Sequence, residues 1–100
     1  MINVTKEAAE WFKQELDLQE GQAIRFFPRY SSGGGVHPGF SLGIEVNVNV
    51  PASPGLMTEA GGIQFYMEER DLWYLQGYHF NITYNVNASD IEYEYEAARS

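Results

Sequence analysis

The chain has 100 residues and a formal net charge of −8, from 14 Asp and Glu residues against 6 Lys and Arg. This length is typical of one domain, so we expect a single domain over residues 1–100. The negative charge opposes binding to nucleic acid or to an anionic membrane surface. The absence of cysteine excludes disulfides, thiolate metal sites and cysteine nucleophiles. No apolar run is long enough to span a membrane and no signal-peptide pattern is present, so we expect a cytoplasmic protein.

The N-terminal segment predicts an amphipathic helix over residues 6–17. Thr5 can cap this helix, and Glu7 places a negative charge in its first turn, where the helix dipole favours it. Apolar residues recur at spacings of three and four and are expected to form the buried stripe: Ala8, Ala9, Phe12 and Leu16. Gly21 supplies a stop signal after the helix.

Alternating apolar and polar residues predict strands along the rest of the chain. The clearest alternation covers residues 40–50, and a strand from residue 23 is expected to stop at Pro28, since proline cannot donate to a ladder. The other predicted elements are strands at 63–67, 80–87 and 91–96, with a short helical segment at 70–77. Short turns between strands favour antiparallel pairing. The expected fold class is therefore α+β, mainly antiparallel, with an N-terminal helix and a short second helix.

Two stretches of the sequence share a pattern with a known family. Residues 34–42, GGVHPGFSL, resemble the glycine-rich segment of the HesB/IscA-like family, the A-type iron–sulfur carriers. Residues 62–84 look like the strand, short helix and strand that follow it in that family. With the N-terminal helix, the resemblance covers about residues 1–86 and implies a HesB-like domain.

The cysteine ligands of that family have no counterpart in this chain. By the resemblance, the loop cysteine would fall at Val36 and the C-terminal Cys-Gly-Cys pair in or beyond residues 87–100. Cluster irons prefer soft thiolate donors, which valine cannot replace. We therefore expect a non-catalytic protein without a resident cofactor, unable to ligate a cluster through cysteines. The resemblance implies a partner-binding or accessory role related to iron–sulfur cluster biogenesis.

The glycine-rich loop is the first candidate binding site. Its candidate residues are Tyr30, Ser32, Gly34, Gly35, Val36 and His37. Backbone N–H groups of consecutive glycines can converge on a ligand, and loops on a rigid scaffold often carry recognition. The loop lacks the lysine and hydroxyl residue of a Walker motif, so a phosphate cradle is disfavoured.

Two other classes of function involve the same loop. In the first, His37 or His79 joins Glu68, Glu69 or Asp71 in a small-ligand or metal site, although no fixed short spacing links these residues. In the second, a hydrolase would use a loop serine, Ser31 or Ser32, with His37, but no nucleophile elbow is present. The hypothesis that the protein acts by binding a protein partner is favoured over both.

The C-terminal strand is the second candidate site, a strip for a protein partner formed by Glu92, Tyr93, Glu94 and Tyr95. With Glu96, its glutamates share one strand face, opposite the tyrosines. Like charges in a row favour either an edge strand protected from aggregation or a docking strip for a basic partner. In the pair Trp73–Tyr74 one ring must point outward, which leaves a second copy of the chain open as a partner.

Overall fold

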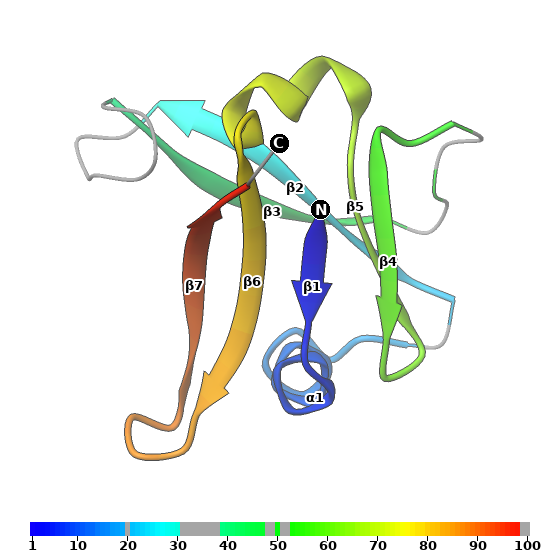
Figure 1. The fold of residues 1–100 in the computed structure, drawn as a ribbon. Helices are drawn as coiled ribbons and strands as arrows, with labels where there is room; N and C mark the ends of the chain where they lie inside the picture. The colour runs from blue at the N-terminus through cyan, green and yellow to red at the C-terminus, as the bar shows by residue number, and fades with distance from the viewer. Residues whose placement is uncertain (20, 31–38, 48–49, 51–52, 99–100) are drawn as a thin grey trace.

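Seven strands and two helices make up the part of the chain described by the computed structural model, residues 1–19, 21–30, 39–47, 50 and 53–98 (Figure 1). In chain order the elements are β1 (Ile2–Val4), α1 (Lys6–Glu15), β2 (Ala23–Tyr30), β3 (Phe40–Asn47), β4 (Leu56–Ala60), β5 (Ile63–Met67), the 3₁₀ helix η1 (Glu69–Leu75), β6 (Tyr78–Asn85) and β7 (Asp90–Ala97).

The strands form two facing sheets. One has the order β1-β6-β7 and the other the order β3-β2-β5-β4. The pairs β2–β3, β4–β5 and β6–β7 are antiparallel, whereas β1–β6 and β2–β5 are parallel. The predicted α+β class is confirmed, and each sheet is mixed rather than purely antiparallel.

Helix α1 begins where the sequence predicts and ends two residues earlier. The Thr5 hydroxyl accepts a hydrogen bond from the Ala8 N–H at 3.2 Å and caps the first turn. The helix stops at Glu15 because Asp17 takes a left-handed backbone conformation, with φ of 49°. The prediction that Leu16 extends the buried stripe was wrong, since Leu16 follows the helix and is 40% exposed. Neither helix in the described ranges has the length and apolarity needed to cross a membrane.

Strand β2 continues through Pro28 to Tyr30, so the predicted stop at the proline was wrong. The parallel partner β5 pairs with residues 23–25 of β2, and beyond them β3 is the one partner of β2 among the described strands. A proline whose nitrogen faces the unpaired side of a strand removes no ladder bond, which makes Pro28 compatible with this position.

Several boundaries differ from the prediction. Strands β1 and β4 were not predicted, because a three-residue strand is too short to show a period and the segment of β4 alternates weakly. The strand expected over residues 40–50 ends at Asn47, with residues 48–49 outside the described ranges. The short helix near residue 70 is a 3₁₀ helix, and β6 begins two residues before the predicted start.

Aromatic rings join the two sheets and the helix in one core. Phe26 of β2 stacks on Phe65 of β5, with ring centroids 6.1 Å apart. It also meets Phe80 of β6 edge-on at 5.4 Å, and Phe12 of α1 contacts both Phe26 and Phe65. All four rings are fully buried. Because Phe26 contacts the other sheet and α1, it lies at the centre of the fold.

The inner face of β3 is only partly covered. Ile44 and Val46 lie opposite the buried Phe26 and Ile24, so their side chains point to the same side of the sheet. Each is nevertheless 39% exposed. The alternation predicted this apolar face but not its exposure, which arises because β3 is an edge strand.

Candidate functional site

Most of the glycine-rich loop lies outside the residues that the structure describes, namely Ser31, Ser32, Gly34, Gly35, Val36 and His37. Its first candidate residue, Tyr30, is the last residue of β2 and is 85% exposed. The ring of Tyr30 packs on Phe40, the first residue of β3, with centroids 4.8 Å apart. The role of the loop in binding stays a prediction.

An exposed tryptophan adjoins this aromatic pair. Trp73 of η1 is 43% exposed, whereas the following Tyr74 is fully buried. The Trp73 ring meets Phe40 edge-on at 5.2 Å. The prediction that one ring of the Trp73–Tyr74 pair points outward is therefore confirmed.

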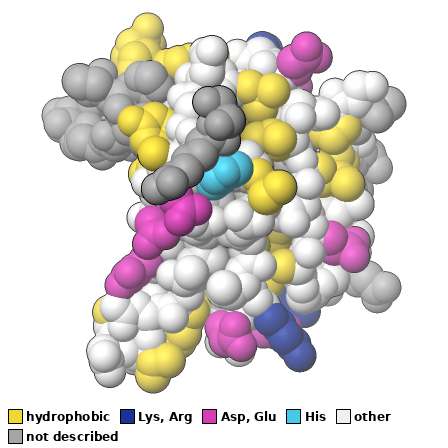
Figure 2. Space-filling model, in the orientation of Figure 1, with side chains coloured by type: hydrophobic (Ala, Val, Ile, Leu, Met, Phe, Trp, Pro, Cys, Tyr) yellow, Lys and Arg dark blue, Asp and Glu magenta, His cyan; other side chains and the backbone are white. Residues whose placement is uncertain are grey.

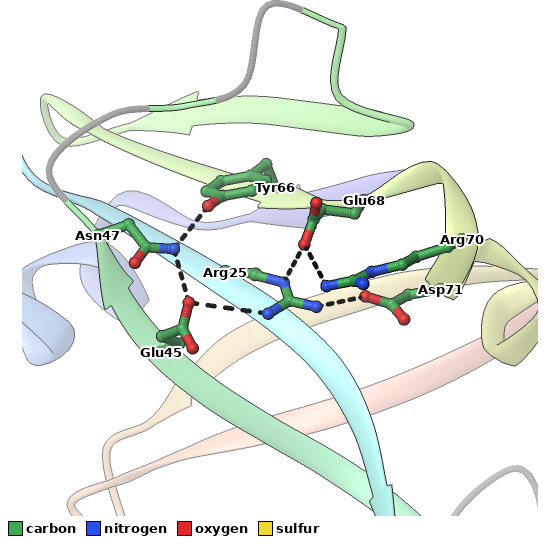
Figure 3. A network of polar contacts seen from close by, with 7 residues as sticks. All are labelled: Arg25, Glu45, Asn47, Tyr66, Glu68, Arg70 and Asp71. Atoms are coloured by element: carbon green, nitrogen blue, oxygen red, sulfur yellow. Dashed lines mark hydrogen bonds and ion pairs between the residues drawn. The ribbon is translucent and has the colours of Figure 1, made fainter.

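An arginine whose side chain is 13% exposed gathers acidic side chains on the outer face of the four-stranded sheet (Figure 3). Arg25 of β2 contacts Asp71 of η1 through Nη2, at 2.8 Å from Oδ2. Its Nε lies 2.8 Å from Oε2 of Glu68, and its Nη1 lies 3.7 Å from Oε1 of Glu45 on β3. The guanidinium therefore links η1 to two strands of the sheet.

The carboxylates decide the charge state of Arg25. Burial alone would lower the pKa of the guanidinium, but the hydrogen bond to Asp71 and the charges of Glu68, Asp71 and Glu45 outweigh burial and raise it. The guanidinium also lies over the Phe27 ring, 5.1 Å from its centroid. Arg25 thus stays charged and holds Asp71, which is only 9% exposed, in an ion pair.

The polar network extends from Arg25 along the sheet. The Asn47 amide donates hydrogen bonds to Glu45 at 2.9 Å and to the Tyr66 hydroxyl at 2.7 Å. At the other end Arg70 contacts Glu68 at 3.3 Å. Sequence reasoning missed this network, since its residues are scattered along the chain. The one available signal was an arginine at a polar position of an otherwise apolar strand.

The network removes two of the proposed metal ligands. Glu68 and Asp71 pair with Arg25, while Glu69 is exposed. Among the residues with described positions, no group of three His, Asp or Glu side chains could hold a metal ion. His37 lies outside those residues, so its part of the hypothesis stays a prediction.

Strand β7 is an edge strand, which the sequence analysis gave as one of two alternatives, and it pairs with β6 alone among the described strands. Its glutamates Glu92, Glu94 and Glu96 are exposed and lie opposite Thr83, Asn81 and His79 of β6. Figure 2 shows acidic side chains in a line over this strand. None of the described Lys and Arg side chains forms an ion pair with them.

Amide side chains of β6 contact two of these glutamates. The Asn81 amide donates to Glu94 at 3.4 Å, and the Asn85 amide donates to Glu92. Neutral amides hold the carboxylates in place without cancelling their charge. The outer face of β7 therefore keeps a row of negative charges.

The inner face of β7 is aromatic. Tyr93 packs on Phe80 and Phe26, with centroids 5.3 and 6.5 Å away, yet keeps 37% of its surface exposed. Burial, with a smaller effect from the charge of Asp90, raises the pKa of Tyr93 to about 12. Burial and a hydrogen bond with Tyr74 raise the pKa of Tyr95 as well.

Comparison with solved structures defines the class of fold. The chain resembles IscA, in a crystal structure with the 2Fe-2S cluster, with a TM-score of 0.57 over 97% of this chain and 82% of that chain. The sequence identity is 13%, so the likeness concerns the fold, and it supports the HesB/IscA-like fold that the sequence resemblance implied.

Sequence comparison gives the family, although no family model matches the chain. The chain is 38% identical to the pyruvate dehydrogenase inhibitor of Bacillus subtilis (strain 168) over 95 residues, which cover 95% of this chain and 98% of that protein. It is 31% identical to an uncharacterized protein of Staphylococcus saprophyticus, over 92% of this chain and 95% of the relative. The chain belongs to the family of these small proteins.

The cluster bound by IscA does not suit the donor set of this chain. Iron–sulfur clusters are held by cysteine thiolates, and this sequence contains none. The IscA-like fold is thus present without cysteine donors.

Proposed function

We propose that this protein is a non-catalytic, HesB-like protein that binds a pyruvate dehydrogenase and inhibits it. The observation that carries the proposal is the 38% identity to the Bacillus subtilis pyruvate dehydrogenase inhibitor, which extends over nearly the whole length of both chains. A similarity over the whole length supports a shared surface as well as a shared fold.

The chemistry of the chain supports inhibition by binding. The sequence contains no cysteine, so neither a thiol nucleophile nor a thiolate-held cluster contributes. Its exposed aromatic residues Tyr30 and Trp73 and its acidic edge strand β7 are features through which small domains contact other proteins. The IscA-like fold agrees with the HesB-like part of the proposal.

A direct test measures pyruvate dehydrogenase activity while the purified chain is added. The enzyme complex comes from the organism that encodes this chain. We expect activity to fall with added protein and to level off at a fixed ratio of inhibitor to enzyme, because a specific complex saturates. An IscA protein is the matched control, since it shares the fold and not the family.

Two results would contradict the proposal. The first is unchanged activity at an excess of the chain over the enzyme, combined with no complex in analytical ultracentrifugation. The second is equal inhibition by the IscA control, which would assign the effect to the fold or to acidic protein in general.

A further inference from the structure

The two facing sheets differ by one strand. Tyr93 of β7 contacts Phe26 of β2, and at the other side β1 contacts β4. Phe80 of β6 also contacts Phe26, at 5.4 Å, so β6 and β7 both pack over β2. No described strand pairs with the side of β7 that faces away from β6, so β7 is the edge of its sheet within the described ranges.

Within the described ranges, the backbone of β7 offers unpaired hydrogen-bonding groups on the side that faces away from β6. The Ala98 N–H donates to the Gly77 carbonyl at 2.9 Å, next to the pair Tyr78–Ala97. In an antiparallel ladder, hydrogen-bonded and non-hydrogen-bonded residue pairs alternate. The backbone N–H and C=O groups of Glu92, Glu94 and Glu96 therefore bond to β6. The N–H and C=O groups that point to the free edge belong to Ile91, Tyr93, Tyr95 and Ala97.

The bonds of β6 to its other neighbour agree with this alternation. The Phe80 N–H donates to the Met1 carbonyl at 2.8 Å, and the Ile82 carbonyl accepts from the Thr5 N–H at 3.1 Å. Phe80 and Ile82 thus direct backbone groups toward β1, away from β7. They are the residues opposite Tyr95 and Tyr93, which is the expected pattern for non-bonded pairs.

Charge decides what kind of strand fits beside β7. A second copy of the chain, added antiparallel through its own β7, would bring two rows of Glu92, Glu94 and Glu96 together. Like charges on adjacent strands are destabilising, and each copy carries a net charge of −8. A segment with basic residues on one face is attracted instead, and apolar residues on its other face would pack beside Tyr93, which is 37% exposed.

We propose that the free edge of β7 binds an extended segment of the target protein in which basic and apolar residues alternate. The segment adds a fourth strand to the β1-β6-β7 sheet. Its basic side chains meet Glu92, Glu94 and Glu96, and its apolar side chains lie beside the partly exposed Tyr93 on the inner face of the sheet. This inference rests on the proposed function, because it names the surface through which pyruvate dehydrogenase is bound.

Amide hydrogen exchange followed by NMR tests the surface without the enzyme. The probe is a synthetic eight-residue peptide of alternating lysine and valine, and the matched control carries glutamate for lysine. In the free protein we expect fast exchange at Tyr93, Tyr95 and Ala97 and slow exchange at Glu92 and Glu94. The lysine peptide should slow exchange at the first group alone, and the glutamate peptide should leave it unchanged.

Two variants carry the test to the enzyme. The triple variant Glu92→Gln, Glu94→Gln, Glu96→Gln removes the charges, and Ala97→Pro removes a free-edge N–H without removing a ladder bond. We expect each to weaken inhibition by about threefold to tenfold, the effect of losing a few polar contacts in an interface. The matched controls are Ala97→Ser, which keeps the N–H, and the triple variant Glu15→Gln, Glu59→Gln, Glu69→Gln, which makes the same charge change at exposed glutamates outside β7.

The outcomes separate the two proposals. If the chain does not inhibit the enzyme but the lysine peptide protects the free edge, the proposed function fails and the binding surface stands. If the chain inhibits and both test variants inhibit like the parent, the surface is wrong and the function stands. Two further outcomes would overturn the inference. Dimerisation of the parent through β7 would assign the edge to a second copy of the chain. Self-association of the triple variant with unchanged inhibition would assign the glutamates to protection from aggregation.

Discussion

Acidic side chains gather in two regions of this protein, and their surroundings differ. Around Arg25, the carboxylates of Asp71, Glu68 and Glu45 share one largely enclosed guanidinium. On β7, the row of exposed glutamates contacts only neutral amides of β6 among its described neighbours. The first group links η1 to the sheet, whereas the second forms no ion pair with the described Lys and Arg side chains.

This difference separates charges that hold the fold from charges that are available to a partner. A buried ion pair is costly to break, because the remaining charge stays without compensation. A row of exposed like charges adds nothing to stability and is free to attract an opposite charge. Substitutions in the two regions should therefore affect different properties of the protein.

The largest effect is expected at Arg25. Replacing it by alanine leaves Asp71 buried without its cation and removes the contact with Phe27. We expect Arg25→Ala to lower the free energy of unfolding by about 3 kcal/mol, measured by urea denaturation.

Arg70 provides the control for this prediction, because it contacts the same Glu68 with a side chain that is 72% exposed. Arg70→Ala should change the free energy of unfolding by no more than about 0.5 kcal/mol. Equal losses for the two variants would show that burial of the guanidinium does not matter and would remove the distinction between the two regions.

The fold was more accessible to sequence reasoning than the sites. Strands such as β6 and β7 alternate strictly, and Thr5 caps α1 by a local contact, so short-range patterns predict them. The proline in β2 misled the prediction, because its effect depends on which neighbour a strand has at that point. Pairing of this kind is set by residues far away in the sequence.

The sites show the same limit. The row of glutamates on β7 follows from a period of two, and its place at a sheet edge was one of two predicted alternatives. The Arg25 network could not be predicted, because it joins residues from β2, β3 and η1 that meet only in the folded chain. The exposure of Ile44 and Val46 also depends on the fold, since β3 lies at the edge of its sheet.

The tyrosine on the inner face of β7 gives a smaller effect that depends on pH. Its pKa is raised from 10.0 to about 12, so the folded state retains the proton after the unfolded chain has lost it. The resulting stability is present below pH 10 and is lost as the pH rises from 10 to about 12. Because Tyr93 is partly exposed, we expect this loss to be no more than about 1 kcal/mol.

Urea midpoints at pH 8 and pH 11 test this expectation with the variant Tyr93→Phe. The variant should lose less stability than the parent between the two pH values, because it carries no phenol to ionise. Tyr30→Phe is the control, since the Tyr30 ring is 85% exposed and lies outside the core. If Tyr93→Phe and the parent lose the same amount, the inner face of β7 is more open to water than its contacts with Phe26 and Phe80 indicate.

The smallest effect is expected when the charges of β7 are removed. Neighbouring glutamates on one strand face lie about 7 Å apart, a distance at which like charges repel at low salt. Glutamine keeps the contacts with Asn81 and Asn85 while it removes this repulsion. The triple variant Glu92→Gln, Glu94→Gln, Glu96→Gln should therefore be more stable than the parent by up to about 0.5 kcal/mol at low salt, and the gain should disappear near 1 M salt.

A loss of stability would mean that these carboxylates hold the fold as those around Arg25 do. A gain, together with weaker inhibition of pyruvate dehydrogenase, would show that β7 carries charges that the free protein does not need and that its partner does.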